Sequence, residues 1–176
     1  MRKYKTQILA LTASILFWML CYSCTAQAQT KKPLPALDSL PYLTADSTLN
    51  NFMLHWIGKP YKLGGKTEKG IDCSQFNKRL YTDVYKLNLE NVCYKQWAQT
   101  NRVPKDSLQI GDLLFFRSRQ SPSGWHCAVY LGETMFIHAA NRYEGVKISS
   151  MAEPNYKKAF RGAGRLKPIN NDTKKP

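Results

Sequence analysis

The stretch Ile71-Asp72-Cys73-Ser74-Gln75-Phe76 follows a glycine-rich loop and begins a predicted helix that runs from about Cys73 to Leu87. Asp72 is placed to cap that helix. A cysteine at a helix start has a chemical consequence, because free backbone amides and the helix dipole favour the thiolate, which is the nucleophilic form. The same amides can bind the oxyanion of a tetrahedral intermediate. Cys73 is therefore a candidate nucleophile.

Two histidines lie at the ends of predicted strands. His126 opens one strand and His138 closes the next, with a turn at Gly132-Glu133 between them. If the two strands pair as an antiparallel hairpin, the histidines lie near one end of it and can act as a base and the residue that orients the base. Spacing alone leaves the blander alternatives open, a buried structural cysteine and two structural histidines.

The order of the predicted elements defines the fold class. A helix with one apolar stripe begins at about Thr48, and the helix at Cys73 follows it. After Pro104 the pattern changes to short strands separated by turns. Helices followed by a run of strands predict an α+β fold in which the N-terminal helices pack on an antiparallel sheet. The predicted strands are 113–116, 127–131, 134–138, 146–149 and a last strand through 165–166. One helical turn is predicted over 156–160.

Five segments, in order, resemble the NlpC family of bacterial cell-wall cysteine peptidases. They are Pro60-Tyr61-Lys62-Leu63-Gly64-Gly65, Asp72-Cys73-Ser74, the run 108–116, His126 with the strand 128–132 after it, and Phe136-Ile137-His138-Ala139. Together they cover about residues 48 to 167. The stretch from His138 through Ser149 to Tyr156 is most similar to the small Gram-negative lipoprotein branch of the family.

The resemblance implies a papain-like NlpC fold and a site that hydrolyses peptide bonds in peptidoglycan. It implies Cys73 as nucleophile, His126 as base and His138 as the residue that orients His126. Tyr61 and Ser74 are expected to support substrate binding or the oxyanion site, and Asp72 to support the helix start. Members of the family cut either the D-Ala to diaminopimelate cross-link or the D-Glu to diaminopimelate bond, and the sequence does not choose between them.

Three residues depart from the family pattern. Gln75 stands where glycine is usual, and its side chain either narrows the cleft or points to solvent. Cys127 follows His126, and strand alternation sends it to the opposite face, which favours a core role. Cys93 stands where a small polar residue is expected. We expect three free thiols; a Cys93–Cys127 disulfide would leave Cys73 free, and a Cys73–Cys93 disulfide would silence it reversibly.

The N-terminus has the pattern of an export signal. A basic start is followed by an uncharged apolar run from Ile8 to Leu20 and by Ala26-Gln27-Ala28, which predicts a signal peptide over 1–28. An alternative is lipidation at Cys24, with anchoring in the outer membrane. A linker is expected over 29–45, the peptidase domain over 46–168 and a flexible tail over 169–176.

The charge and the predicted location of the chain limit the classes of binding partner. The net charge of +14 permits an anionic polymer or membrane. Export to the periplasm excludes a genomic role, so peptidoglycan is the expected partner and nucleic acid is not. The chain is expected to be a monomer that needs no cofactor and no metal. Two alternatives to an endopeptidase remain: a catalytically silent, wall-peptide-binding or regulatory member, and an amidase or acyltransferase on the same fold.

Overall fold

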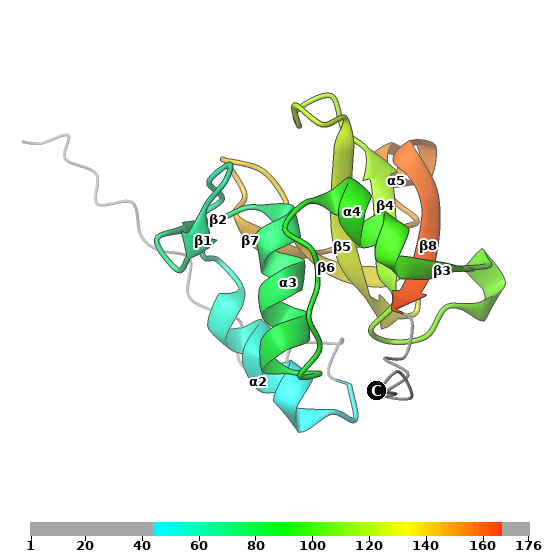
Figure 1. Ribbon diagram of the computed structural model, residues 1–176, viewed down its shortest axis with the longest axis horizontal. Coiled ribbons are helices and arrows are strands. Elements are labelled where there is room, and N and C mark those ends of the chain that lie inside the picture. Colours follow the sequence, from blue (N-terminus) through cyan, green and yellow to red (C-terminus); the bar gives the residue numbers. More distant parts are fainter. Residues whose placement is uncertain (1–43, 167–176) are drawn as a thin grey trace, which may run out of the picture. The chain divides into compact units, whose positions relative to one another are not determined.

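The computed structural model describes residues 44–166 (Figure 1). The predicted signal peptide, Cys24, nearly all of the linker and the C-terminal tail lie outside the described residues. Within 44–166, no helix is both long and apolar enough to cross a membrane.

A six-stranded antiparallel sheet carries the fold, with the strand order β3-β8-β4-β5-β6-β7. Strands β4 to β7 form the predicted meander, because each pairs with the next along the chain. Strand β8 returns to lie between β3 and β4. The α+β prediction is therefore confirmed. The strands are β3 (Thr100–Val103), β4 (Leu113–Arg117), β5 (Trp125–Gly132), β6 (Met135–Ala139), β7 (Val146–Ser150) and β8 (Phe160–Leu166).

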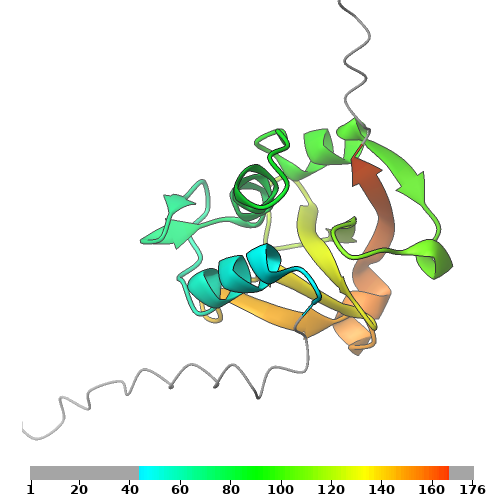
Figure 2. The ribbon, with the colours of Figure 1, turned by 90° about the horizontal axis from the view of Figure 1, so that it is seen from below.

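Helices cover both faces of the sheet. The helices α2 (Ser47–Trp56), α3 (Cys73–Asp83) and α4 (Cys93–Gln99) lie against one face, and α5 (Pro154–Ala159) packs on the other. Figure 2 shows α2 and α3 side by side, with α5 away from them. The remaining elements are a small hairpin of β1 (Lys66–Thr67) and β2 (Gly70–Ile71) and a 3-10 turn, η2 (Lys105–Ser107).

Strand β4 is apolar at four successive positions because both of its faces are covered. Leu113 and Phe115 point into the core under α2, α3 and α4, whereas Leu114 and Phe116 point into a second core under α5. All four side chains are buried because both faces are covered. Because the helices pack on the sheet, α3 lies directly against β5 and β6, which carry His126 and His138.

The structure corrects the second helix and adds two elements. Helix α3 ends at Asp83, four residues before the predicted Leu87, because Lys86 adopts a left-handed conformation with φ of 57° and the Leu87 amide donates to the Tyr81 carbonyl at 3.0 Å. Neither α4 nor β3 is predicted from the sequence pattern. Helix α4 has only seven residues and no side-chain cap, and β3 is a largely polar edge strand, so neither shows a clear period.

Candidate active site

Asp72 fixes the start of α3. One carboxylate oxygen accepts from the Gln75 amide at 2.9 Å and lies 2.8 Å from the Ser74 hydroxyl. The other accepts from the Gly64 amide at 2.9 Å, which ties the preceding loop to the helix. The predicted cap is thus confirmed. Because Asp72 occupies the Gln75 amide, the amides of Cys73 and Ser74, which have no acceptor inside the helix, are left to bind another group.

Cys73 is buried but reaches the wall of a cleft. Its side chain is 6% exposed and lines a hollow of about 290 Å³ together with Tyr61 and His126. Hydrogen bonds from the Cys127 and Cys93 thiols, and then the nearby His126, lower the pKa of Cys73 well below its usual value, against the opposite effect of burial. The geometry therefore favours a thiolate at position 73, the form in which sulfur is nucleophilic.

His126 and His138 are in direct contact. Nε2 of His126 lies 2.7 Å from Nδ1 of His138. Both residues are on neighbouring antiparallel strands, β5 and β6, as the hairpin prediction requires. His138 is 1% exposed. Burial, and then the charges of His126 and Lys147, lower the pKa of His138 well below its usual value, so the buried ring is neutral.

Two residues without a predicted role hold the far side of His138. Its Nε2 lies 3.1 Å from the Ser149 hydroxyl and 3.4 Å from the Tyr156 hydroxyl. The tautomer of this ring is linked to the protonation of His126. When His126 donates from Nε2, His138 must accept at Nδ1, so His138 carries its proton on Nε2 and donates it to Ser149.

The cleft is completed by two loops that sequence patterns do not single out. The loop after β4 contributes Ser118, Gln120 and Ser121, and the loop between β6 and β7 contributes residues 140–143, including Arg142 and Tyr143. These are polar loop residues with no motif of their own. They line the cleft only because the hairpins end beside Cys73.

Tyr61 lies beside Cys73 in the cleft wall, as expected. Its backbone forms an isolated bridge with Ile71, which holds the loop against the strand that leads to α3. Burial, and then the negative charges of Cys73 and Asp72, raise the pKa of Tyr61 to about 12. Its hydroxyl therefore keeps its proton and can donate a hydrogen bond into the cleft.

Ser74 and Gln75 point away from the cleft. The Ser74 hydroxyl is buried between Asp72 and the Asn91 carbonyl, 2.8 Å from each, so its side chain holds the helix start and any oxyanion support must come from its amide. Nε2 of Gln75 donates to the same Asn91 carbonyl at 3.1 Å. The side chain of Gln75 therefore neither narrows the cleft nor points freely into solvent.

The three cysteines of the described residues are free thiols. Cys127 is fully buried in the core, as expected. Strand alternation holds, and on the face under α3 and α4 the sulfur of Cys127 lies within 4.8 Å of those of Cys73 and Cys93. The start of α3 and the start of α4 meet over β5 at this point, which brings Cys127 into the neighbourhood of the nucleophile.

A cysteine at a helix start, a cleft beside it and two linked histidines on an antiparallel sheet are the features of a papain-like cysteine peptidase, a class of hydrolase. The family model of the NlpC/P60 family matches residues 58–165. The chain belongs to the NlpC/P60 family.

Curated relatives agree with this assignment. The chain is 34% identical over 167 residues to a protein of Haemophilus influenzae named a probable endopeptidase, and the match covers 91% of this chain and 96% of that one. It is 40% identical over 111 residues to the Escherichia coli K12 murein DD-endopeptidase MepS/murein LD-carboxypeptidase, covering 63% of this chain. The match spans only 57% of the length of the Escherichia coli protein.

Solved structures share the fold. An NlpC/P60 family protein from Bacillus cereus matches with a TM-score of 0.62 and 29% identity, over 75% of this chain and 43% of that one. The NlpC/p60 domain of the peptidoglycan hydrolase SagA matches with a TM-score of 0.57 and 29% identity, over 70% of this chain and all of that domain.

Proposed function

We propose that this protein is an endopeptidase that hydrolyses amide bonds in the stem peptides or cross-links of peptidoglycan through an acyl-enzyme on Cys73. The observation that carries the proposal is the alignment of three groups: the Cys73 thiol and His126 share a cleft wall, and His138 contacts His126 from behind at 2.7 Å. The names of the relatives, a murein DD-endopeptidase and a peptidoglycan hydrolase among them, support the choice of substrate.

The first half-reaction forms a thioester. The Cys73 thiolate attacks the carbonyl carbon of the substrate amide, and the oxygen becomes an oxyanion. The amides of Cys73 and Ser74 at the start of α3, with the hydroxyl of Tyr61, are available to stabilise that oxyanion. His126, which His138 holds through its Nε2, gives a proton to the leaving amine. The C–N bond breaks and the acyl group stays on Cys73.

The second half-reaction uses water. Neutral His126 takes a proton from a water molecule, and the hydroxide attacks the thioester carbonyl. The C–S bond breaks, a carboxylic acid is released and the Cys73 thiolate returns. Throughout, His138 stays neutral and keeps the His126 ring in one orientation, which is the role of a positioning residue.

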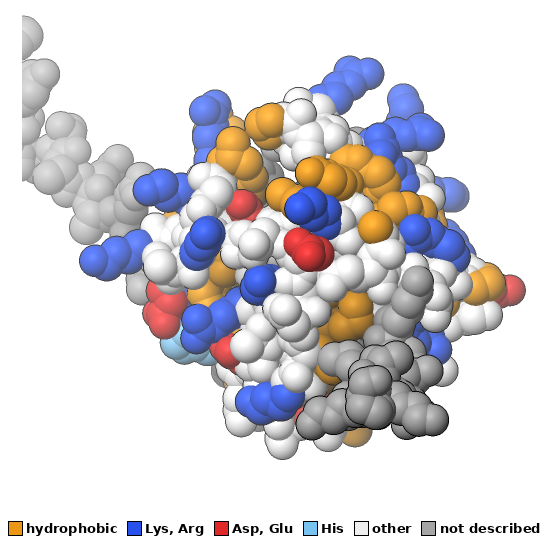
Figure 3. All heavy atoms as spheres, in the orientation of Figure 1, with side chains coloured by type: hydrophobic (Ala, Val, Ile, Leu, Met, Phe, Trp, Pro, Cys, Tyr) orange, Lys and Arg blue, Asp and Glu red, His pale blue; other side chains and the backbone are white. Residues whose placement is uncertain are grey.

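Positive charge fits a substrate that carries carboxylates. Lys and Arg side chains predominate over Asp and Glu on the face in Figure 3, in keeping with the charge of +14. At the cleft, Arg142 stacks over the ring of Tyr143, with 4.7 Å between the guanidinium carbon and the ring centroid. Free carboxylates of stem peptides are matched by such a guanidinium.

The cellular placement completes the proposal. Residues 1–28 act as a signal peptide that directs the chain to the periplasm, and acylation of Cys24 is the alternative that would anchor it in the outer membrane. Mass spectrometry of the mature N-terminus distinguishes a start at Gln29 from an acylated Cys24.

A digest of purified cross-linked peptidoglycan tests the activity. The purified protein and its Cys73→Ser variant are incubated with the polymer under reducing conditions with a chelator, and soluble fragments are identified by mass spectrometry. New stem fragments from the wild type only are expected, and their masses identify the bond. Release of free amino-sugar chains would point instead to an amidase. The absence of fragments from a folded wild type would contradict the proposal.

A further inference from the structure

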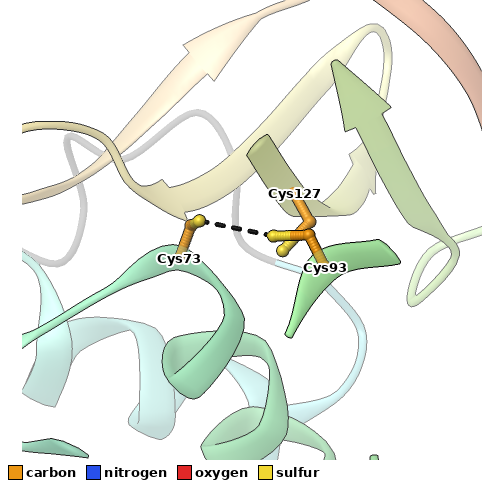
Figure 4. A group of neighbouring side chains, drawn as sticks. All are labelled: Cys73, Cys93 and Cys127. Carbon is orange, nitrogen blue, oxygen red and sulfur yellow. Dashed lines mark hydrogen bonds between the residues drawn. The ribbon is translucent and has the colours of Figure 1, made fainter. Parts of the chain in front are cut away.

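The sulfurs of Cys73, Cys93 and Cys127 converge on one point (Figure 4). Sγ of Cys73 lies 3.5 Å from Sγ of Cys93, and all three sulfurs lie within 4.8 Å of one another. They come from three different elements, α3, α4 and β5. The proposed hydrolysis needs only the first of these thiols, so the other two are unexplained by it.

The spacing suits a metal ion bound by sulfur. A tetrahedral zinc site has Zn–S bonds of about 2.3 Å, which places two sulfurs roughly 3.8 Å apart. The 3.5 Å contact is close to that value, and because all three sulfurs lie within 4.8 Å of one another the other pairs need to contract by no more than about 1 Å. Three thiol donors with no carboxylate among them select soft ions such as Zn²⁺, Cd²⁺ or Cu⁺ over Mg²⁺ or Ca²⁺.

The surroundings support the three sulfurs as a unit. Sγ of Cys127 lies 3.4 Å from Oε1 of Gln96, and Gln96 is fully buried. The amide of Gln96 is itself held, because Nε2 donates to the carbonyls of Ser74 and Glu90 at 2.8 Å each. The two Nε2 bonds fix α4 relative to the start of α3 whether or not the thiols carry their protons, which is the kind of outer support that orients metal ligands.

We propose that Cys73, Cys93 and Cys127 form a binding site for one soft d¹⁰ metal ion of the Zn²⁺ class. Each thiol that binds loses its proton to solvent, so the bound state has three metal–thiolate bonds. The ion enters from the cleft, whose wall includes Cys73.

Metal binding and hydrolysis exclude each other at this site. A metal–thiolate bond uses the electron pair with which Cys73 would attack a carbonyl, so the bound protein is inactive and a chelator restores it. This consequence rests on the proposed function of Cys73, whereas the binding itself does not. Two additional ligands distinguish the site from a lone cysteine that any heavy metal can block.

Cadmium titration of the reduced, metal-free full-length protein tests the proposal without use of activity, with Cys21→Ser and Cys24→Ser introduced so that Cys73, Cys93 and Cys127 are its only cysteines. Thiolate-to-cadmium charge transfer absorbs in the ultraviolet and increases with the number of Cd–S bonds, so peptides with one to four cysteines calibrate it. One ion per chain with the absorbance of three thiolates is expected. Zn²⁺ should displace the band. The Cys93→Ser and Cys127→Ser variants should each lose about one thiolate of absorbance and bind more than about 100-fold more weakly.

An absorbance of a single thiolate in the wild type, or unchanged affinity in both variants, would overturn the site. Should a variant fail to fold by circular dichroism, the wild type decides by itself: an absorbance of three thiolates per bound Cd²⁺ supports the site, and an absorbance of one thiolate contradicts it. Hydrolysis is measured separately with chelator present, so an inactive protein with a three-thiolate band would refute the proposed function and leave the metal site intact.

Discussion

Nε2 of His126 lies 2.7 Å from Nδ1 of His138, and this contact links the protonation of the two rings. A donor on His126 requires an acceptor on His138, and the proton of His138 is then on the side of Ser149. The same contact joins β5 to β6 beside the start of α3, so the orientation of the proposed base depends on the register of one hairpin.

Replacement of His138 should show whether this residue acts on the reaction by orienting His126. In His138→Ala, the Nε2–H of His126 loses its acceptor, and kcat should fall by about 10²- to 10⁴-fold, the range assigned to general acid–base catalysis. His138→Gln offers a carbonyl oxygen at a similar reach and should retain more of kcat than the alanine variant. Steady-state kinetics on a soluble stem-peptide substrate measures both. Equal loss in the two variants would argue against an orienting role.

Ser149 should act on the reaction through His138. Ser149→Ala removes the acceptor of the His138 Nε2 proton in a buried environment, which should cost about 1 to 2 kcal/mol of unfolding free energy and lower kcat with little change in KM. The matched control is Ser150→Ala, whose hydroxyl is exposed and bonds only Thr134 Oγ1 at 2.9 Å among the side chains. A changed pH profile of kcat in Ser149→Ala, and not in the control, distinguishes positioning from a loss of stability alone.

The three thiols should differ in reactivity. Hydrogen bonds from Cys127 and Cys93 and the nearby His126 lower the pKa of Cys73, whereas burial raises the pKa of Cys127 well above its usual value. In metal-free protein, alkylation of Cys73 by iodoacetamide should persist well below pH 9, while Cys127 stays unmodified in the folded state. Peptide mapping after short exposures measures each site. The rate at Cys73 in His126→Ala should fall at neutral pH, and an unchanged rate would exclude His126 as its partner.

Stability should fall in acid because of His138. Burial lowers the pKa of this residue in the folded protein below the usual 6.5. The unfolded chain therefore binds a proton that the folded chain does not, so folding stability is full above about pH 6.5 and decreases as the pH falls below it. Urea denaturation from pH 7.5 to 5 measures the slope. His138→Gln should show a flatter dependence over that window, and an identical slope would contradict this assignment.

Arg142 should act on substrate binding. Arg142→Gln removes the guanidinium at the cleft and should raise KM several-fold with kcat nearly unchanged. The reason is that this contact is expected to bind the substrate and the transition state equally, so its loss weakens binding without slowing the chemical step. Added salt should narrow the difference from the wild type. Arg79→Gln is the matched control, because Arg79 pairs with Asp83 on the surface of α3 and does not line this cleft. Equal effects of the two substitutions would indicate a general charge effect.

Local patterns in the chain predict most of the site. The cap at Asp72, the helix that begins at Cys73 and the hairpin of His126 and His138 follow from short-range rules of capping and alternation, and the structure places them as expected. Helix α4 is not predictable in this way. It is too short for a helical period, and Val92 at its N-cap makes no side-chain hydrogen bond, so its position is set by packing against β4 and β5.

The fold class, the cysteine at a helix start and the two histidines can be predicted from the chain alone, because each depends on residues near one another in the chain. Three relationships become visible only in the folded protein: Cys93 and Cys127 lie beside Cys73, Ser149 and Tyr156 hold His138, and Arg142 reaches the cleft. These relationships join segments separated by about 10 to 70 residues in the chain, and they depend on strand register and helix packing, which no local pattern encodes.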